Sequence, residues 1–473
     1  MMTKLLLRSF IFFFALLGPL GLLPSVLANT EIVFSSGEPA RIHQLQTVTS
    51  EDGQWVEMGS GSATGGGISN NGGSSYLASL AIDRNGTPIV AWLDDSNGND
   101  EIYVRRWDGT VWVEMGTGSA SGGGISNNSG GSLYPSLAIS PDGTPIVAWM
   151  DGSNGNSEIY VRRWNGISWV EMGNGSASGG GISNNSEDSS EPSLAISPDG
   201  TPMIAWTDYS GDDSEIYLRI WNGTDWVELG SGSASAGGIS NDDGGSGSPF
   251  LAISPDGKPI IAWVNYSSDD EEIYVRRWDG TAWAEIGTGS ASGGGISNNN
   301  SDSESPSLAI SPNGTPIIAW EDKSSGKEEI YVRRWDGTAW VEMGTGSASG
   351  GGISNNSGGS YEPSLAIDPD GLTVIAWHDW SNSPPYPNDN SEIYVRYWNS
   401  IEWVEMGSGS ATGGGISDDK GSGYNPSLAI GPDGIPVIAW GNWADDNPEI
   451  YVRRWLADVT DFRLFLPSVL AKE

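Results

Sequence analysis

A repeated pattern constrains this 473-residue chain more than any other feature of its sequence. The string WVEMG, or a close variant, starts at seven tryptophans that lie 57 residues apart five times and 63 residues apart once. These are Trp55, Trp112, Trp169, Trp226, Trp283, Trp340 and Trp403. A fixed period of this kind is typical of solenoids, propellers and other arrays of supersecondary units.

Three further strings recur in step with the first. In the first copy they are a run centred on Leu80, a PIVAW run that ends at Trp92 and an EIYVRRW run that ends at Trp107. Each string is short, rich in β-branched and aromatic residues, and bounded by turn residues such as Asp108-Gly109. Each is therefore predicted to be a strand.

Four strands in each of seven copies predict an all-β fold, a seven-bladed β-propeller of four-stranded blades. An open solenoid of seven repeats is the alternative. The ends of the series favour a closed ring, because the chain starts with a fourth strand at 54–59 and stops after a third strand in the last copy, 427–455. The N-terminal strand can complete the last blade and so remove the exposed edges of an open array.

The first residues have the pattern of an export signal. Lys4 and Arg8 precede an apolar run, and Val26-Leu27-Ala28 ends it with a small residue. An uncleaved membrane anchor is the alternative, although Gly and Pro interrupt a run that is short for a bilayer span. We expect a protein that is secreted or held at the cell surface, without membrane insertion. The predicted parts are a signal peptide 1–28, a lead-in 29–51, the propeller 52–455 and a tail 456–473.

Charge and composition argue against several classes of function. A formal charge of -38 disfavours binding to nucleic acid or to an anionic membrane, because like charges repel. The chain has no cysteine, so disulfides and thiolate metal sites are excluded, and secretion without cysteine favours a bacterial exterior. Of the 23 tryptophans, 21 belong to the repeats and are predicted to form the core. We expect the protein to be a monomer.

Strand order predicts tight turns on one face of the ring and long loops on the other, where binding residues are expected. The blade-to-blade loop, 116–128 in one copy, recurs almost unchanged. Its glycines are expected to adopt positive φ angles, and Ile125 to anchor it in the core. Asn127 and Asn128 offer ligand oxygens or partners for sugar hydroxyls. Recent duplication alone is the alternative reason for the identity of these loops.

The loop after each PIVAW tryptophan is acidic. An aspartate lies two residues beyond that tryptophan in five copies: Asp94, Asp151, Asp208, Asp322 and Asp379. Oxygen ligands crowded on a turn are the chemistry of calcium, so a Ca²⁺ site is one prediction for these aspartates. A solvated acidic turn is the alternative, because the spacing of the neighbouring acids drifts between copies.

Aromatic residues gather on the same predicted face. The third residue beyond the PIVAW tryptophan is aromatic in four copies: Tyr209, Tyr266, Trp380 and Trp443. Tyr76, Tyr361 and Tyr424 precede first strands, and Tyr386 follows Trp380 in an insertion. A flat apolar ring beside Asp, Asn and Ser groups suits the recognition of a pyranose, so these residues are predicted to contact glycan.

The repeat unit resembles secreted bacterial β-propeller repeats of the sialidase-like type over about residues 52–455. The hairpin Trp278–Trp283, WDGTAW, shares Asp, Gly, Thr and Trp with the sialidase Asp-box but lacks its leading Ser and is shorter. The resemblance implies the propeller fold. The arginine triad, the Tyr/Glu pair and the acidic Asp of a sialidase do not map onto this chain, which favours a non-catalytic member.

Three functions are consistent with these observations. The first is a non-catalytic propeller that binds extracellular glycan, or a cell-surface protein, through the long-loop face. The second is a sialidase-like glycoside hydrolase, for which the region around His378 is the most asymmetric candidate. The third is a structural or adhesion module. Near-identity of the repeats favours multivalent binding over catalysis, because a reaction needs different groups around one substrate.

Overall fold

A computed structural model describes residues 53–457, apart from 243, 268–269, 382–389, 418–420 and 444–446. The predicted signal peptide 1–28, the lead-in 29–51, Tyr386 and residues 458–473 of the predicted tail lie outside the described residues. No described segment forms a helix that is long and apolar enough to cross a membrane.

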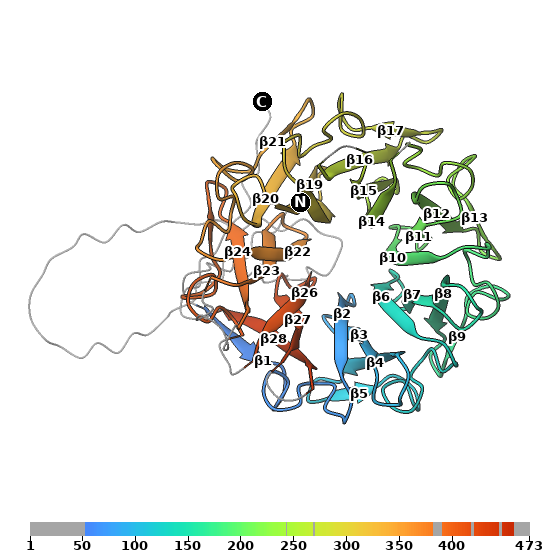
Figure 1. Ribbon diagram of the computed structural model, residues 1–473. Helices are drawn as coiled ribbons and strands as arrows, with labels where there is room; N and C mark the ends of the chain where they lie inside the picture. The colour runs from blue at the N-terminus through green and yellow to red at the C-terminus, as the bar shows by residue number, and fades with distance from the viewer. Residues whose placement is uncertain are drawn as a thin grey trace, which may run out of the picture. The chain divides into compact units, whose positions relative to one another are not determined.

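Seven antiparallel four-stranded sheets form the blades, and within blades 1 to 6 the four strands pair in chain order. Blade 1 consists of β2 (Ser75–Ile82), β3 (Pro88–Asp94), β4 (Glu101–Trp107) and β5 (Trp112–Glu114). Blade 2 consists of β6 (Ser132–Ile139), β7 (Pro145–Asp151), β8 (Glu158–Trp164) and β9 (Trp169–Glu171). Blade 3 consists of β10 (Ser189–Ile196), β11 (Pro202–Asp208), β12 (Glu215–Trp221) and β13 (Trp226–Glu228). Blade 4 consists of β14 (Ser246–Ile253), β15 (Pro259–Asn265), β16 (Glu272–Trp278) and β17 (Trp283–Glu285). Blade 5 consists of β18 (Ser303–Ile310), β19 (Pro316–Asp322), β20 (Glu329–Trp335) and β21 (Trp340–Glu342). Blade 6 consists of β22 (Ser360–Ile367), β23 (Thr373–Asp379), β24 (Glu392–Trp398) and β25 (Trp403–Glu405). Figure 1 shows the ring along its axis, with β2, β6, β10, β14, β22 and β26 innermost. The predicted seven-bladed propeller is confirmed.

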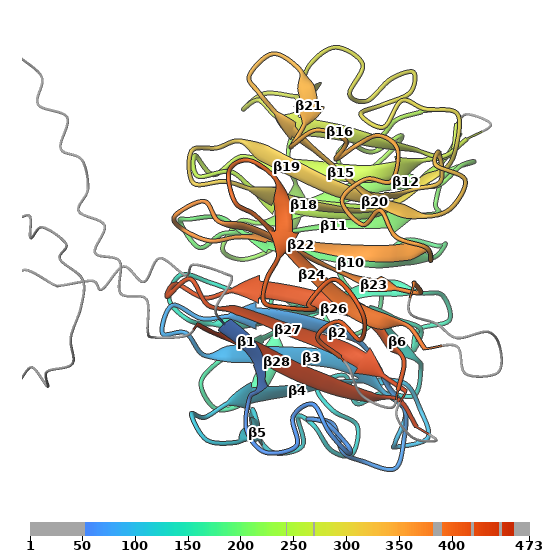
Figure 2. The same cartoon turned by 90° about the vertical axis from the view of Figure 1, so that its left-hand side faces the viewer.

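Blade 7 is built from both ends of the propeller. It contains β26 (Gly423–Ile430), β27 (Pro436–Asn442), β28 (Glu449–Ala457) and the N-terminal β1 (Gly53–Glu57). β1 pairs antiparallel with β28 and sets Trp55 opposite Trp455, with ring centroids 5.7 Å apart. In Figure 2 the blue β1 lies against the red β28. This pairing closes the ring as predicted.

The core lies between neighbouring blades. Each second-strand tryptophan, such as Trp149, is fully buried against the second and third strands of the preceding blade. Six of the seven fourth-strand tryptophans also bridge blades by hydrogen bonds: Trp112 Nε1 donates to the carbonyl of Met58, 3.0 Å away. The second-strand tryptophans therefore lie in the core, as the sequence predicted, and half-buried tryptophans such as Trp164 and Trp169 pack against it.

A serine on six of the seven first strands joins neighbouring innermost strands. Ser79 Oγ accepts a hydrogen bond of 2.9 Å from the backbone N–H of Leu137 in the next blade. The same bond links five other pairs of blades, including the closing pair, Ser427 to Leu80. Phe250 occupies the serine position in blade 4, which cannot supply this acceptor to blade 5.

Candidate functional site

A β-bulge in every first strand places one ring of residues at the long-loop end of the central channel. The register shifts between Tyr76 and Ser79 in β2, and at the corresponding point in the six other first strands. The residue in the bulge adopts a φ near +50° although it is never glycine. These seven residues form what we call the mouth ring: Leu77, Tyr134, Glu191, Ser248, Ser305, Glu362 and Asn425.

The mouth ring lines a cavity of about 480 Å³ to which all seven first strands contribute. Its side chains are apolar, aromatic, acidic, hydroxyl or amide, whereas the strands that carry them repeat almost unchanged. Left-handed non-glycine residues cost conformational energy and concentrate at functional sites. The near-identity of the repeats thus describes the scaffold, while the mouth of the channel differs from blade to blade.

The five aspartates predicted to bind calcium lie apart, one in each of five blades, and all are buried. In blade 2, Asp151 Oδ2 accepts hydrogen bonds from Trp149 Nε1 at 2.9 Å and Ser132 Oγ at 3.1 Å, and Oδ1 accepts the N–H of Ser153 at 3.0 Å. No group of three His, Cys, Asp or Glu side chains suited to a metal ion occurs among the described residues. The calcium site stays a prediction, and the hydrogen bonds indicate a structural role for these carboxylates.

In each of these networks a carboxylate accepts a hydrogen bond from a side-chain amide. Asn128 Nδ2 donates to Asp151 Oδ2 in blade 2. In blade 4 the two residue types are exchanged, so that Asn265 Nδ2 donates to Asp242 Oδ2. Each described pair combines one carboxylate with one amide. The exchange is visible in the sequence and could have identified the pair before the structure.

The repeated blade-to-blade loop completes the edge of each blade. β5 is only three residues long, and the loop pairs with the other half of β4: Val104 N–H donates to the Ser119 carbonyl and Ile125 N–H to the Ile102 carbonyl. Gly122 and Gly124 adopt the expected positive φ of 59°, and Ile125 is buried as predicted. The fold itself therefore requires this loop.

The two asparagines predicted to bind ligand in this loop do not act alike. Asn128 is engaged with Asp151 and also accepts the N–H of Gly130 at 3.0 Å. Asn127 is exposed, has a φ of +46° and donates its backbone N–H to the Gly123 carbonyl. Neither side chain belongs to the mouth ring.

Every aromatic side chain that is more than about a third exposed in the described part of the chain lies in the mouth ring or directly beyond a second strand. Tyr209, Tyr266, Trp380 and Trp443 are 46%, 40%, 37% and 48% exposed. Tyr134 of the mouth ring, which the sequence did not single out, is 42% exposed. We call the positions directly beyond the second strands the rim: Asp95, Gly152, Tyr209, Tyr266, Lys323, Trp380 and Trp443.

Trp443 stands between two of the tyrosines predicted to contact ligand. Its ring centroid lies 6.3 Å from that of Tyr76 in blade 1 and 6.4 Å from that of Tyr424 in blade 7. Burial raises the pKa of Tyr424, so the ring stays neutral. The three residues form an aromatic cluster that spans the junction where the ring closes.

Several ionisable side chains lie close together in blades 5 and 6. Glu321 is only 5% exposed, and burial raises its pKa to about 7 although its Oε1 accepts the N–H of Glu362 at 2.6 Å. His378 Nδ1 lies 3.1 Å from Glu362 Oε2, and the His378 ring stacks on Tyr361 at 5.1 Å. Burial, together with the hydrogen bond from its hydroxyl to Glu328, raises the pKa of Tyr361 to about 12.

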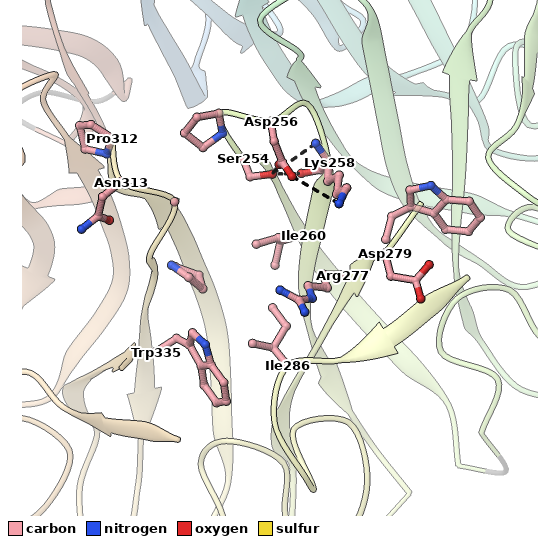
Figure 3. A pocket seen from close by; sticks show the side chains of 14 residues that line it. Ser254, Asp256, Lys258, Ile260, Arg277, Asp279, Ile286, Pro312, Asn313 and Trp335 are labelled. Carbon is pink, nitrogen blue, oxygen red and sulfur yellow. Dashed lines mark hydrogen bonds and ion pairs between the residues drawn. The ribbon is translucent and has the colours of Figure 1, made fainter. Parts of the chain in front are cut away.

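A second cavity of about 430 Å³ lies between blades 4 and 5 on the short-turn face (Figure 3). Lys258 and Arg277 supply its positive charges, and Trp335 forms one wall. The Lys258 ammonium lies 3.4 Å from Asp256 Oδ2, so an acid of the same turn already neutralises it. Apart from Lys258, the cavity consists of positions that the other blades repeat closely, and it lacks the diversity of the mouth.

No protein-family model matches the chain, and no curated protein matches its sequence. Solved structures that resemble it include a protein of unknown function from Dyadobacter fermentans, 12% identical, covering 70% of this chain and 96% of that one with a TM-score of 0.45. An α-L-arabinofuranosidase of Fusarium graminearum in complex with arabinobiose is 16% identical (70% and 93% covered, TM-score 0.43). An ulvan lyase is 11% identical (81% and 94% covered, TM-score 0.48). Glycan-active enzymes thus occur among the structural neighbours of this propeller.

Proposed function

We propose that this chain is a secreted, non-catalytic propeller that binds an extracellular glycan at the mouth of its central channel. The confinement of exposed aromatic side chains to the mouth ring and the rim carries this proposal. Exposed aliphatic residues such as Ile167 and Ile401 lie instead on the turns of the opposite face. Aromatic rings beside hydroxyl, amide and carboxylate groups supply both the stacking surface and the directional partners that a sugar needs.

The cluster of Tyr76, Trp443 and Tyr424 is the main contact surface in this proposal. Trp443 is nearly half exposed, and its two tyrosine neighbours hold the ring in place without covering it. Asn425 of the mouth ring adjoins the cluster, and its N–H donates to Glu362 Oε2 at 3.1 Å. The site combines a fixed aromatic face with polar groups on rigid strands.

A glycan array probed with the protein, once in calcium and once in EDTA, tests the proposal. Selective binding is expected in at least one condition, and Trp443→Ala should weaken it about tenfold by removing the stacking ring. Ile401→Ala is the matched control, because it removes an exposed apolar side chain from the opposite face. A blank array in both conditions, or equal losses in the two variants, would refute the proposal.

A sialidase-like glycoside hydrolase is the second candidate, and the buried Glu321 favours it. The Glu321 carboxyl group has a pKa near 7, accepts the backbone N–H of Glu362 and is repelled by the Glu362 charge, and such a pair of acids resembles the acid and base that glycoside hydrolysis uses. Release of reducing ends from the polysaccharides that bind, and its loss in Glu321→Gln, would favour this candidate. Binding without product release would favour the non-catalytic role.

Export is a further part of the proposal. It is supported by the N-terminal pattern of basic residues, apolar run and Ala28. N-terminal sequencing of the protein from the culture medium should begin at Asn29. Recovery of the intact chain from the cytoplasm would contradict this part.

A further inference from the structure

Three tyrosines and a carboxylate lie on the side of the mouth formed by blades 2 to 4. Tyr134 and Glu191 are neighbours in the mouth ring and line the central cavity. Tyr209 and Tyr266 occupy the rim in blades 3 and 4. None of these four residues belongs to the Trp443 cluster, so the two groups can be altered separately.

Hydrogen bonds hold the Glu191 carboxylate by one oxygen. Oε2 accepts the Thr207 hydroxyl at 3.0 Å and the backbone N–H of Ser248 at 2.9 Å. In the part of the chain that the structure describes, no lysine, arginine or histidine pairs with Glu191. By contrast, Glu362 faces His378, and Glu304 is paired with Lys323. Glu191 is thus the fixed carboxylate of the mouth ring whose charge has no cationic partner there.

The tyrosine rings lie close to this charge. Tyr266 crosses the first strand of its blade, because a Cβ on Gly247 would lie 2.8 Å from the Tyr266 hydroxyl, next to Ser248. Burial raises the pKa of Tyr266 to about 12, and repulsion from the Glu191 carboxylate adds to the shift. Burial and the same carboxylate raise the pKa of Tyr134. Both rings therefore remain neutral near this negative charge.

We infer that Tyr134, Glu191, Tyr209 and Tyr266 form a binding site for an organic ammonium group. The faces of aromatic rings attract such cations, and cages of this composition bind quaternary ammonium groups. The carboxylate supplies the neutralising charge, and the net charge of -38 draws cations toward the protein. The same chemistry accepts the trimethylammonium group of a choline-type compound and the protonated amine of an amino sugar.

Titrations of the protein with two pairs of probes, followed by ligand-observed NMR, test this inference. Choline is compared with its neutral isostere 3,3-dimethyl-1-butanol, and glucosamine with glucose. At least one cation should bind tenfold or more tightly than its neutral counterpart. The pair that shows this preference identifies whether the site takes a methylated ammonium or an amino sugar.

Variants separate the site from general attraction to an acidic surface. Glu191→Gln should weaken binding of the cation at least tenfold, whereas Glu187→Gln, an exposed acid of the same blade, should leave it unchanged. Tyr209→Ala provides a second test on an exposed ring if Glu191→Gln does not fold. Trp443→Ala should leave cation binding intact, so failure of the glycan proposal does not affect this test. Equal binding of cation and isostere, absence of binding, or equal losses in the Glu191 and Glu187 variants would overturn the inference.

Discussion

Replacing Asp151 by asparagine should reveal how much stability the carboxylate–amide pair of a blade contributes. In this buried network Asp151 Oδ2 accepts hydrogen bonds from Trp149 Nε1, Ser132 Oγ and Asn128 Nδ2, while Oδ1 accepts Ser153 N–H. If the asparagine side-chain oxygen keeps the hydrogen bond from Ser153 N–H, its amide N–H₂ faces the three groups that donate to Asp151 Oδ2 in the parent. Those three donors then lose their acceptor. Hydrogen bonds to a charged group contribute about 1.5–3 kcal/mol each, so after partial relaxation we expect a loss of roughly 4 kcal/mol.

Blade 4 shows what the compensating change must be. There Asn265 faces Asp242, which accepts the Asn265 amide and Ser246 Oγ at 3.0 Å, and within this network the indole N–H of Trp263 lacks a partner. The double variant Asn128→Asp/Asp151→Asn recreates this arrangement. It should therefore lose only about 1–2 kcal/mol, the cost of one unpaired buried donor.

Scanning calorimetry of the two single variants and the double variant measures the coupling. With an unfolding entropy of about 2.1 cal/mol/K per residue over roughly 400 residues, 1 kcal/mol corresponds to about 1 °C in Tm. The single variant Asp151→Asn should thus melt about 4–5 °C lower than the parent, and the double variant about 1–2 °C lower. The reverse exchange in blade 4, Asp242→Asn/Asn265→Asp, should raise Tm by about 1 °C. Additive losses in the blade 2 double variant would refute this reasoning.

Three further outcomes follow from the fold and the mouth. Ser136→Ala removes the acceptor of the Leu194 N–H and should lower Tm by about 1–2 °C, with Ser121→Ala on an exposed loop as the control. Burial raises the pKa of Glu321 from 4.5 to about 7, so the folded state retains this proton and stability falls as the pH rises from 4.5 to 7. Glu321→Gln should therefore raise Tm by about 3 °C at pH 8 and leave it unchanged at pH 4, and an equal shift at both pH values would contradict the assignment. Deletion of residues 1–58 removes β1 (Gly53–Glu57), so β28 loses its partner and the ring can no longer close. The far-UV circular dichroism spectrum should keep its β character, while thermal unfolding becomes less cooperative. A melting curve like that of the parent would show that closure of the ring by β1 is dispensable.

The strand positions and the closure of the ring could be predicted because they depend on the repeat period and on the residue types within each repeat. Both can be read from the sequence without knowledge of three-dimensional contacts. An Asp-Gly pair such as Asp108-Gly109 favours a tight turn, and a tryptophan such as Trp149 within an apolar run favours burial. The mouth could be predicted only in part. Tyr209 and Trp443 were indicated by aromatic residues in a polar loop, yet Tyr134 was not, because its exposure depends on a bulge inside a strand.

The bulge is also marked in the sequence, although the strand prediction did not use this mark. A proline follows the bulge residue in six of the seven first strands, as Pro135 follows Tyr134. Proline cannot donate to a ladder and marks irregular points of strands. The role of Asp151 was also missed, because an acid in a turn-rich segment suggests solvent or a metal, whereas here it is buried and bonded to an indole. Such a partner is determined by three-dimensional packing alone.

The pairing of β1 with β28 has a consequence for the timing of synthesis. β1 leaves the ribosome first, and its partner strand, which begins at Glu449, emerges almost 400 residues later. At 5–20 residues per second this interval lasts roughly 20 to 80 s, during which the first strand has no neighbour. Blades 1 to 6 can assemble in order during that time, so blade 7 is the last to gain protection from proteases. An arrested chain that ends before Glu449 would carry six formed blades and one unpaired N-terminal strand.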